Sequence, residues 1–178
     1  MVAVEPETEQ VLGVAMWMPP GKGMDFPVTT LIKCGAVQAV LAWGPGALKR
    51  IFADFVPRSE EAKARAFTAR GKDTKDCWYL LQFAVDPSAQ GRGVGSLLMA
   101  DGIARAGRRP LHLEASSPKS RDIYLHFGCV LDEEVIIGQG AVDAKGVVPK
   151  SYADATGYPL YVMTKVRGGP SQNTFHQP

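Results

Sequence analysis

The chain has 178 residues, of which 46% are hydrophobic and 21% charged, a composition typical of a globular protein with one domain and a sizeable core. Its 20 basic and 18 acidic residues give a net charge of +2, a balance that argues against a nucleic-acid partner. No apolar run reaches the length of a membrane span and the sequence MVAVEPETEQ has no signal-peptide pattern, so we expect a cytoplasmic protein with no membrane partner.

The first elements are predicted to form a β-hairpin. Residues 1–4 and 11–18 are apolar stretches separated by an acidic turn. Pro19-Pro20-Gly21 ends the second strand, because proline cannot donate to a strand ladder.

Residues 22–76 have helical character interrupted by glycine and proline. Pro27 suits a helix start, and Gly44-Pro45-Gly46 breaks the apolar spacing that follows it. Pro57 is expected to end a second amphipathic helix, and Ser59 to cap a third. These helices are predicted to cover the sheet.

The most informative stretch begins with an apolar strand, residues 78–85. After a turn, Gln90-Gly91-Arg92-Gly93-Val94-Gly95 opens a helix with apolar spacing up to Ala106. Alternating glycines let the backbone approach a ligand, and free N–H groups at a helix start attract an anion. This pattern predicts a phosphate-binding loop.

Two common phosphate-binding motifs do not fit this spacing. A nucleotide P-loop requires a lysine after its glycines, and none is present. A dinucleotide fingerprint would place its third glycine at Ser96 or Leu98. We therefore set a nucleotide-binding domain aside.

The remaining chain alternates strands and helices. Strands are predicted over residues 111–116, 130–137 and 159–166, with a loop that turns into a helix over 116–124 and a polar loop over 138–157. The tail, 167–178, is rich in Gly, Pro, Ser, Gln and Asn and is expected to be disordered. The fold class is α/β with a mixed sheet.

The Gln-x-x-Gly-x-Gly loop between a strand and a helix resembles the acetyl-CoA pyrophosphate loop of the GNAT N-acetyltransferase superfamily. Leu111-His112-Leu113-Glu114-Ala115-Ser116 resembles the family's fifth strand, and Tyr124-Leu125-His126-Phe127-Gly128-Cys129 resembles its Tyr-x-x-x-Gly-Phe helix end. The helical insertion over about 27–70 is similar to that of the puromycin N-acetyltransferase branch and of related fungal enzymes. The resemblance implies one GNAT domain over 1–166, a central mixed β-sheet flanked by helices.

The family usually places a strand and two helices before the first hairpin, so the resemblance also implies a shortened N-terminus. The strand near Val2 would then be an open sheet edge. We expect a homodimer through this edge, or a cover formed by the segment after the hairpin.

The resemblance also implies the residues that bind acetyl-CoA. Backbone groups of the fourth family strand would hold the pantetheine arm, and the loop N–H groups would hold the pyrophosphate. Ser120 stands where the family commonly has an asparagine that contacts the cofactor. The implied set is Phe83, Ala84, Val85, Gln90, Gly91, Arg92, Gly93, Val94, Gly95, Ser96 and Ser120.

Tyr124 occupies the family position of the proton donor to the departing CoA thiolate, although its spacing alone favours a core aromatic residue. The fourth family strand carries Gln82 where many relatives have a glutamate. Glu114, as in the puromycin-type branch, is then predicted to orient the amine or relay its proton. His112 is expected to be a structural strand residue and His126 an exposed one.

These features predict an acetyl-CoA-dependent N-acetyltransferase that acts on a primary amine of a small molecule, by direct transfer in a ternary complex. The alternative is a non-catalytic acyl-CoA-binding protein that has lost its acceptor site. The three cysteines are far apart and lack a Cys-x-x-Cys pair, so we expect reduced thiols and no metal site.

Overall fold

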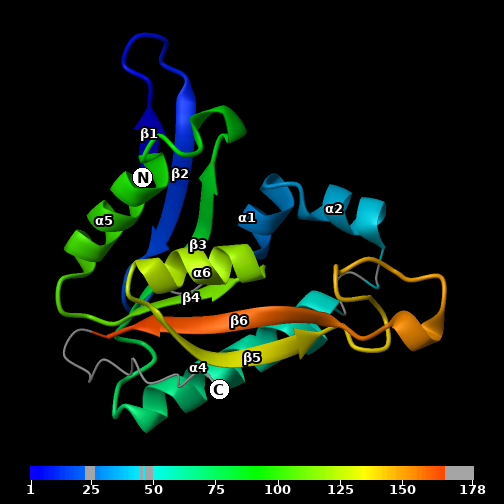
Figure 1. The fold of residues 1–178 in the computed structure, drawn as a ribbon. Helices are drawn as coiled ribbons and strands as arrows, with labels where there is room; N and C mark the ends of the chain where they lie inside the picture. The colour runs from blue at the N-terminus through cyan, green and yellow to red at the C-terminus, as the bar shows by residue number, and fades with distance from the viewer. Residues whose placement is uncertain (23–26, 45, 47–49, 167–178) are drawn as a thin grey trace.

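The structure, a computed structural model, describes residues 1–22, 27–44, 46 and 50–166. Its centre is a six-stranded sheet in the order β1-β2-β3-β4-β6-β5 (Figure 1). The strands are β1 (Val2–Val4), β2 (Val11–Met18), β3 (Trp78–Val85), β4 (Leu111–Ala115), β5 (Val130–Ile137) and β6 (Tyr158–Lys165). β3 and β4 run parallel and the other neighbours antiparallel, so the predicted mixed sheet is confirmed.

Helices cover both faces of this sheet. α5 (Val94–Ala106) and α6 (Pro118–His126) lie on one face, where Leu98 and Tyr124 pack with Leu113 and Met163 in the main core. α4 (Val56–Ala69) lies on the other face, where its Ala62 packs against Val162 of β6 and Val135 of β5. Adjacent β6 residues thus face opposite layers, as the two-residue period of a strand requires.

The start of α4 differs from the sequence prediction. A π-helical turn, Arg50–Phe55, runs directly into α4, so Pro57 does not end a helix but lies in the first turn of one. Proline is tolerated there because first-turn N–H groups have no helical acceptor. Ser59 is consequently not a cap: it lies inside α4, with its side chain buried against the sheet.

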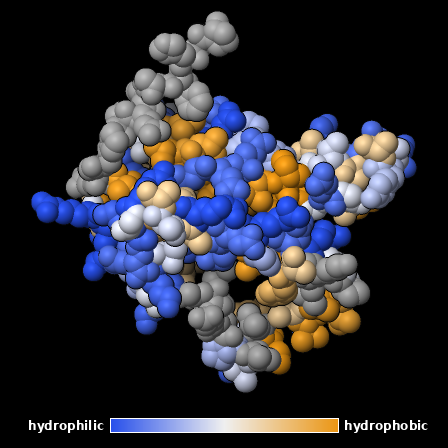
Figure 2. All heavy atoms as spheres, turned by 90° about the horizontal axis from the view of Figure 1, so that it is seen from below, coloured by the Kyte–Doolittle hydropathy of each residue, from blue (hydrophilic) through white to orange (hydrophobic). Residues whose placement is uncertain are grey.

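The expectation that the whole insertion covers the sheet is met only by α4. α1 (Val28–Lys33) and α2 (Ala36–Trp43) form an arm beside the sheet (Figure 1). No described side chain of α2 is buried, and its Leu41 and Trp43 are largely exposed. Figure 2, which views the molecule from below, shows mostly hydrophilic residues with several separate hydrophobic patches between them.

The predicted hairpin is confirmed, with Val2 paired to Val14 across β1 and β2. β1 is the last strand on its side of the sheet, and Val2 and Val4 are exposed. Dimerisation through this edge stays a prediction. The tail that we expect to be disordered lies outside the described residues.

The parallel pair β3–β4 separates part-way along its length. Its ladder runs only from Trp78–Leu111 to Leu80–Leu113, although β3 continues to Val85. Opposite Trp17 and Met16 of β2, β3 places Leu80 and Gln82, so Leu81 is an extra, bulged residue. A bulge bends a strand and shifts by one residue the alternation of its side chains between the two faces of the sheet. This explains why Phe83 packs on the α5–α6 face together with Leu80.

Candidate active site

The glycine loop of the sequence prediction lies between β3 and α5. Gly91 and Gly93 have φ angles of 77° and 82°, a left-handed conformation that glycine adopts at little cost. Within the described part of the chain, no acceptor is found for the backbone N–H groups of Gly91, Gly93, Val94, Gly95 and Ser96. These unpaired donors at the positive end of α5 fit the pyrophosphate of acetyl-CoA.

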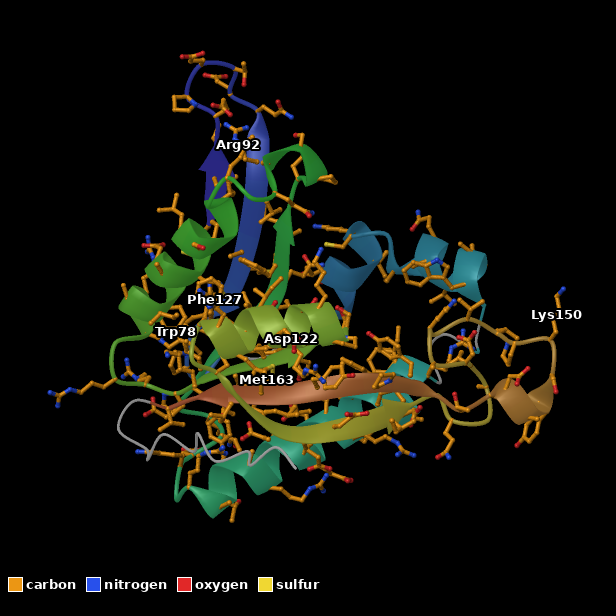
Figure 3. The ribbon with its side chains drawn as sticks, in the orientation of Figure 1. Trp78, Arg92, Asp122, Phe127, Lys150 and Met163 are labelled. Atoms are coloured by element: carbon orange, nitrogen blue, oxygen red, sulfur yellow. The ribbon has the colours of Figure 1, made fainter. Side chains whose placement is uncertain are left out.

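Two side chains of the loop have other contacts. The guanidinium of Arg92 pairs with Glu5 of the β1–β2 hairpin at 3.0 Å, and Figure 3 shows Arg92 beside that hairpin. The Gln90 amide donates to the Val85 carbonyl at 3.4 Å, which ties the loop to the end of β3. The hairpin and β3 thus support the loop from both sides.

A gap opens between β3 and β4 beyond the last paired residues, Leu80 and Leu113. Phe83, Ala84 and Val85 pair with β2 on one side only, so their other edge has no strand partner in the described sheet. An extended ligand could add there as a short strand. These are the residues predicted to hold the pantetheine arm.

Tyr124 lies on the α5–α6 face of this gap. It is buried in the main core, with its ring 6.2 Å from that of Phe83. Burial raises the pKa of the Tyr124 phenol to about 12, so the hydroxyl stays protonated at neutral pH and can donate. Tyr124 therefore has the surroundings of a core aromatic residue and a hydroxyl that keeps its proton.

Glu114 lies on the opposite face, under α4. Its side chain is 9% exposed, and its Oε1 accepts hydrogen bonds from the Ser59 hydroxyl and from Nε2 of His112, the latter at 3.1 Å. Burial alone would raise the pKa of Glu114, but hydrogen bonds from His112, Ser59 and Tyr79 outweigh it and leave this pKa below its usual value. Glu114 is therefore a buried carboxylate that stays ionised.

Ser120 lies in the first turn of α6, near the predicted cofactor site. Its backbone N–H and its hydroxyl both contact the Ser117 hydroxyl, at 3.1 and 2.9 Å. The Ser120 side chain thus takes part in the N-cap of α6.

A groove of about 690 Å³ begins at Ser96 of the glycine loop and follows α6. Asp122 of α6 and Phe127, which directly follows α6, are labelled in Figure 3 and belong to its lining, together with Lys119, Ile123 and His126. His126 is exposed, as predicted.

Residues 53–129 match the model of the acetyltransferase (GNAT) family. This segment of the chain is similar to the GNAT acetyltransferases. This match confirms the family that the glycine loop and the two later motifs indicate. The match includes both the glycine loop and Tyr124.

A curated relative resembles the chain over much of its length. An uncharacterised N-acetyltransferase of Schizosaccharomyces pombe is 28% identical over 133 residues, which cover 74% of this chain and 52% of the relative. The chain thus spans about half the length of that curated relative.

Solved structures are similar in fold. A structure described as histone acetyltransferase HPA2 and related acetyltransferase, from Corynebacterium glutamicum, is 25% identical with a TM-score of 0.51, covering 96% of this chain and 65% of that one. Arylalkylamine N-acetyltransferase 2 from Aedes aegypti is 17% identical with a TM-score of 0.56, covering 93% and 71%. These likenesses confirm the predicted GNAT fold.

Sequence reasoning missed three residues of the Glu114 cluster. His112 is not only a structural strand residue, because it contacts Glu114, and their spacing of two on one strand indicates a shared face. Tyr79 stacks on the His112 ring with centroids 5.4 Å apart. Ser59 gave no local signal, since it lies 55 residues from Glu114 in the sequence.

Proposed function

We propose that this protein is an acetyl-CoA-dependent N-acetyltransferase that acetylates a primary amine of a small molecule by direct transfer in a ternary complex. One observation carries the proposal: the gap between β3 and β4 has the unpaired glycine loop and Tyr124 on one face of the sheet and Glu114 on the other. A cofactor and an amine can therefore reach the same gap from opposite sides.

Acetyl-CoA would supply the acetyl group as a thioester. The loop N–H groups from Gly91 to Ser96 would hold its pyrophosphate, and the free edge of Phe83–Val85 would hold its pantetheine arm. A backbone N–H of that edge would stabilise the oxyanion that develops during transfer. The Tyr124 hydroxyl would donate a proton to the departing thiolate.

Glu114 is suited to orient the amine rather than to serve as its final proton acceptor. A general base works best when its pKa is near the operating pH, and the pKa of Glu114 lies below the usual carboxyl value. An ionised carboxylate does, however, attract and align an ammonium group. The amine would then lose its proton through water.

A small acceptor is favoured over a protein tail by the setting of Glu114. The carboxylate is nearly buried beneath α4, so an acceptor that reaches it must be narrow around its amine. The arylalkylamine enzyme that shares the fold is named for small amines. A lysine-containing peptide is the alternative that the experiment must include.

The proposal is tested by calorimetric titration with acetyl-CoA, followed by thiol release from acetyl-CoA in the presence of aromatic amines, diamines and a lysine peptide. We expect that acetyl-CoA binds and that a small amine causes release of the CoA thiol. Release with the peptide alone would overturn the small-molecule assignment.

The alternative, a non-catalytic acyl-CoA-binding protein, predicts binding without release to any amine of the panel. Absence of acetyl-CoA binding would overturn both functions.

A further inference from the structure

Ser59 of α4 and His112 of β4 both contact the carboxylate of Glu114, and both of these hydrogen bonds go to Oε1. We propose that Ser59 and His112 are positioning residues, which fix Oε1 of Glu114 so that Oε2 points to the acceptor amine. This inference rests on the proposed function and assigns roles within the same site.

Ser59 reaches Glu114 because contacts before and after Ser59 hold α4 beside β5. Near its start, the Asp54 carboxylate accepts from the Gly138 N–H at 2.6 Å. Further along, the Arg65 guanidinium makes two contacts with Glu133 of β5, at 3.0 and 2.8 Å. Between these contacts, Ser59 and Ala62 face the sheet on the buried side of α4.

His112 is held in one orientation by aromatic rings. Tyr79 stacks on it at 5.4 Å with an interplanar angle of 26°, and Phe67 of α4 meets it edge-on at 6.2 Å. Because a carboxylate only accepts hydrogen bonds, Nε2 must carry the hydrogen of this contact. Nδ1 has no hydrogen-bond partner among the described residues.

An ionised carboxylate in a nearly buried site requires donors, since burial disfavours charge. Ser59 and His112 supply them to Oε1 alone, so neither competes with an amine for Oε2. A side chain restrained in this way loses little conformational freedom when the amine binds. The two residues therefore act on the reaction through Glu114.

The other ionisable groups around Glu114 are few. α4 contributes Glu60 and Lys63, which form an ion pair at 3.6 Å, and β3 contributes Tyr79. The Lys63 ammonium lies 6.0 Å from the centre of the Tyr79 ring. From β6, the residue paired with Glu114 is Val162 and the one paired with His112 is Thr164, so this strand adds no charge.

The test compares Ser59→Ala and His112→Leu with conservative variants, Ser59→Thr and His112→Gln, which retain a hydroxyl and an N–H donor. We expect the first pair to raise the amine KM about tenfold, with no change in acetyl-CoA Kd. The acid limb of the kcat/KM profile should move to higher pH, because loss of a donor raises the pKa of a carboxylate. The conservative variants should have an amine KM and an acid limb close to those of the unmodified protein.

A second measurement does not depend on turnover. In protein labelled with ¹³C at glutamate carboxyls, the Glu114 signal is assigned by its loss in Glu114→Gln and titrated in each variant. Ser59→Ala and His112→Leu should shift its midpoint upward, whereas Thr68→Ala, at an exposed position of α4, should not.

Unchanged amine KM, acid limb and carboxyl midpoint in Ser59→Ala and His112→Leu would overturn the positioning role. If the unmodified protein acetylates no amine, the proposed function fails separately. The carboxyl titration then still decides whether Ser59 and His112 hold Glu114 ionised.

Discussion

Tyr124 and Glu114 lie on opposite faces of the sheet, on either side of the gap where β3 separates from β4. Tyr124 packs with Leu113 in the core beneath α5 and α6, whereas Glu114, the next residue of β4, contacts Ser59 of α4. This arrangement separates the side that receives the leaving thiolate from the side that receives the amine. The two candidate catalytic residues can therefore be replaced one at a time, each without a change on the other face of the sheet.

Replacing Tyr124 by Phe should lower kcat by about 10²-fold, because the variant lacks the proton donor for the thiolate. The acetyl-CoA Kd should change little, since the ring and its contact with Phe83 remain. Steady-state kinetics and calorimetry measure the two quantities. Tyr161→Phe, in the same buried core, is the matched control and should retain turnover. Equal turnover in the two variants would return Tyr124 to a purely structural role.

Replacing Glu114 by Gln removes the negative charge with little change of shape. We expect kcat/KM for the amine to fall by roughly 10²-fold, a loss of about 2.7 kcal/mol of transition-state stabilisation. Acetyl-CoA should bind as before, because Glu114 lies on the other face of the sheet. Glu134→Gln on β5, an exposed position, is the control. A Glu114→Gln enzyme with full activity would exclude a role for this carboxylate.

Gly93→Ala should weaken acetyl-CoA binding about tenfold. A side chain at a φ of 82° is strained by about 1–2 kcal/mol, and relief of that strain would redirect the loop N–H groups. Gly71→Ala is the matched control: its φ is 60°, no atom lies within 4 Å of the added Cβ, and it lies outside the loop. Both variants should lose stability in urea, but only Gly93→Ala should lose affinity. Equal Kd values in the two would contradict the pyrophosphate site.

Gly102→Ala should destabilise the protein by about 1–3 kcal/mol, because its Cβ would clash with the Trp17 ring and force repacking of α5 on β2. Urea unfolding measures the change. At Gly95 of the same helix, the nearest atom to an added Cβ is 3.5 Å away, so Gly95→Ala should be tolerated. Similar stabilities for the two variants would show that Trp17 moves aside freely.

Stability should fall at alkaline pH. Burial raises the pKa of the Cys129 thiol from 9.0 to about 11, and that of Tyr124 from 10.0 to about 12. The folded state thus holds these protons more tightly than the unfolded state. The contribution of the protonated groups to the free energy of unfolding is complete below pH 9 and is lost as the pH rises through 11 and 12. For Cys129 the change is on the order of 2 kcal/mol.

Urea midpoints measured between pH 8 and pH 11 give the slope of this loss. Cys129→Ala should lower stability at every pH by creating a cavity, but it should also make the slope shallower. An unchanged slope would mean that the thiol does not titrate differently in the folded and unfolded states.

The sequence by itself determined the glycine loop, the strand before it and the helix after it. These features depend on local chemistry: glycine permits the positive φ angles of Gly91 and Gly93, and apolar spacing separates strands from helices. Family motifs added Tyr124 and Glu114. The expectations that failed, a helix end at Pro57 and a cap at Ser59, also rested on local rules. Proline and serine each suit more than one place in a helix, and neighbouring residues do not decide between them.

Only the tertiary structure decided which residues surround Glu114. Ser59 contacts it across 55 residues of sequence, because α4 is fixed on β5 and β6 at a particular register. The bulge at Leu81 likewise reverses the face of Phe83, a change that depends on pairing with β2 and not on the composition of β3. Contacts of this kind arise from packing between elements, so the pattern within any one segment does not specify them.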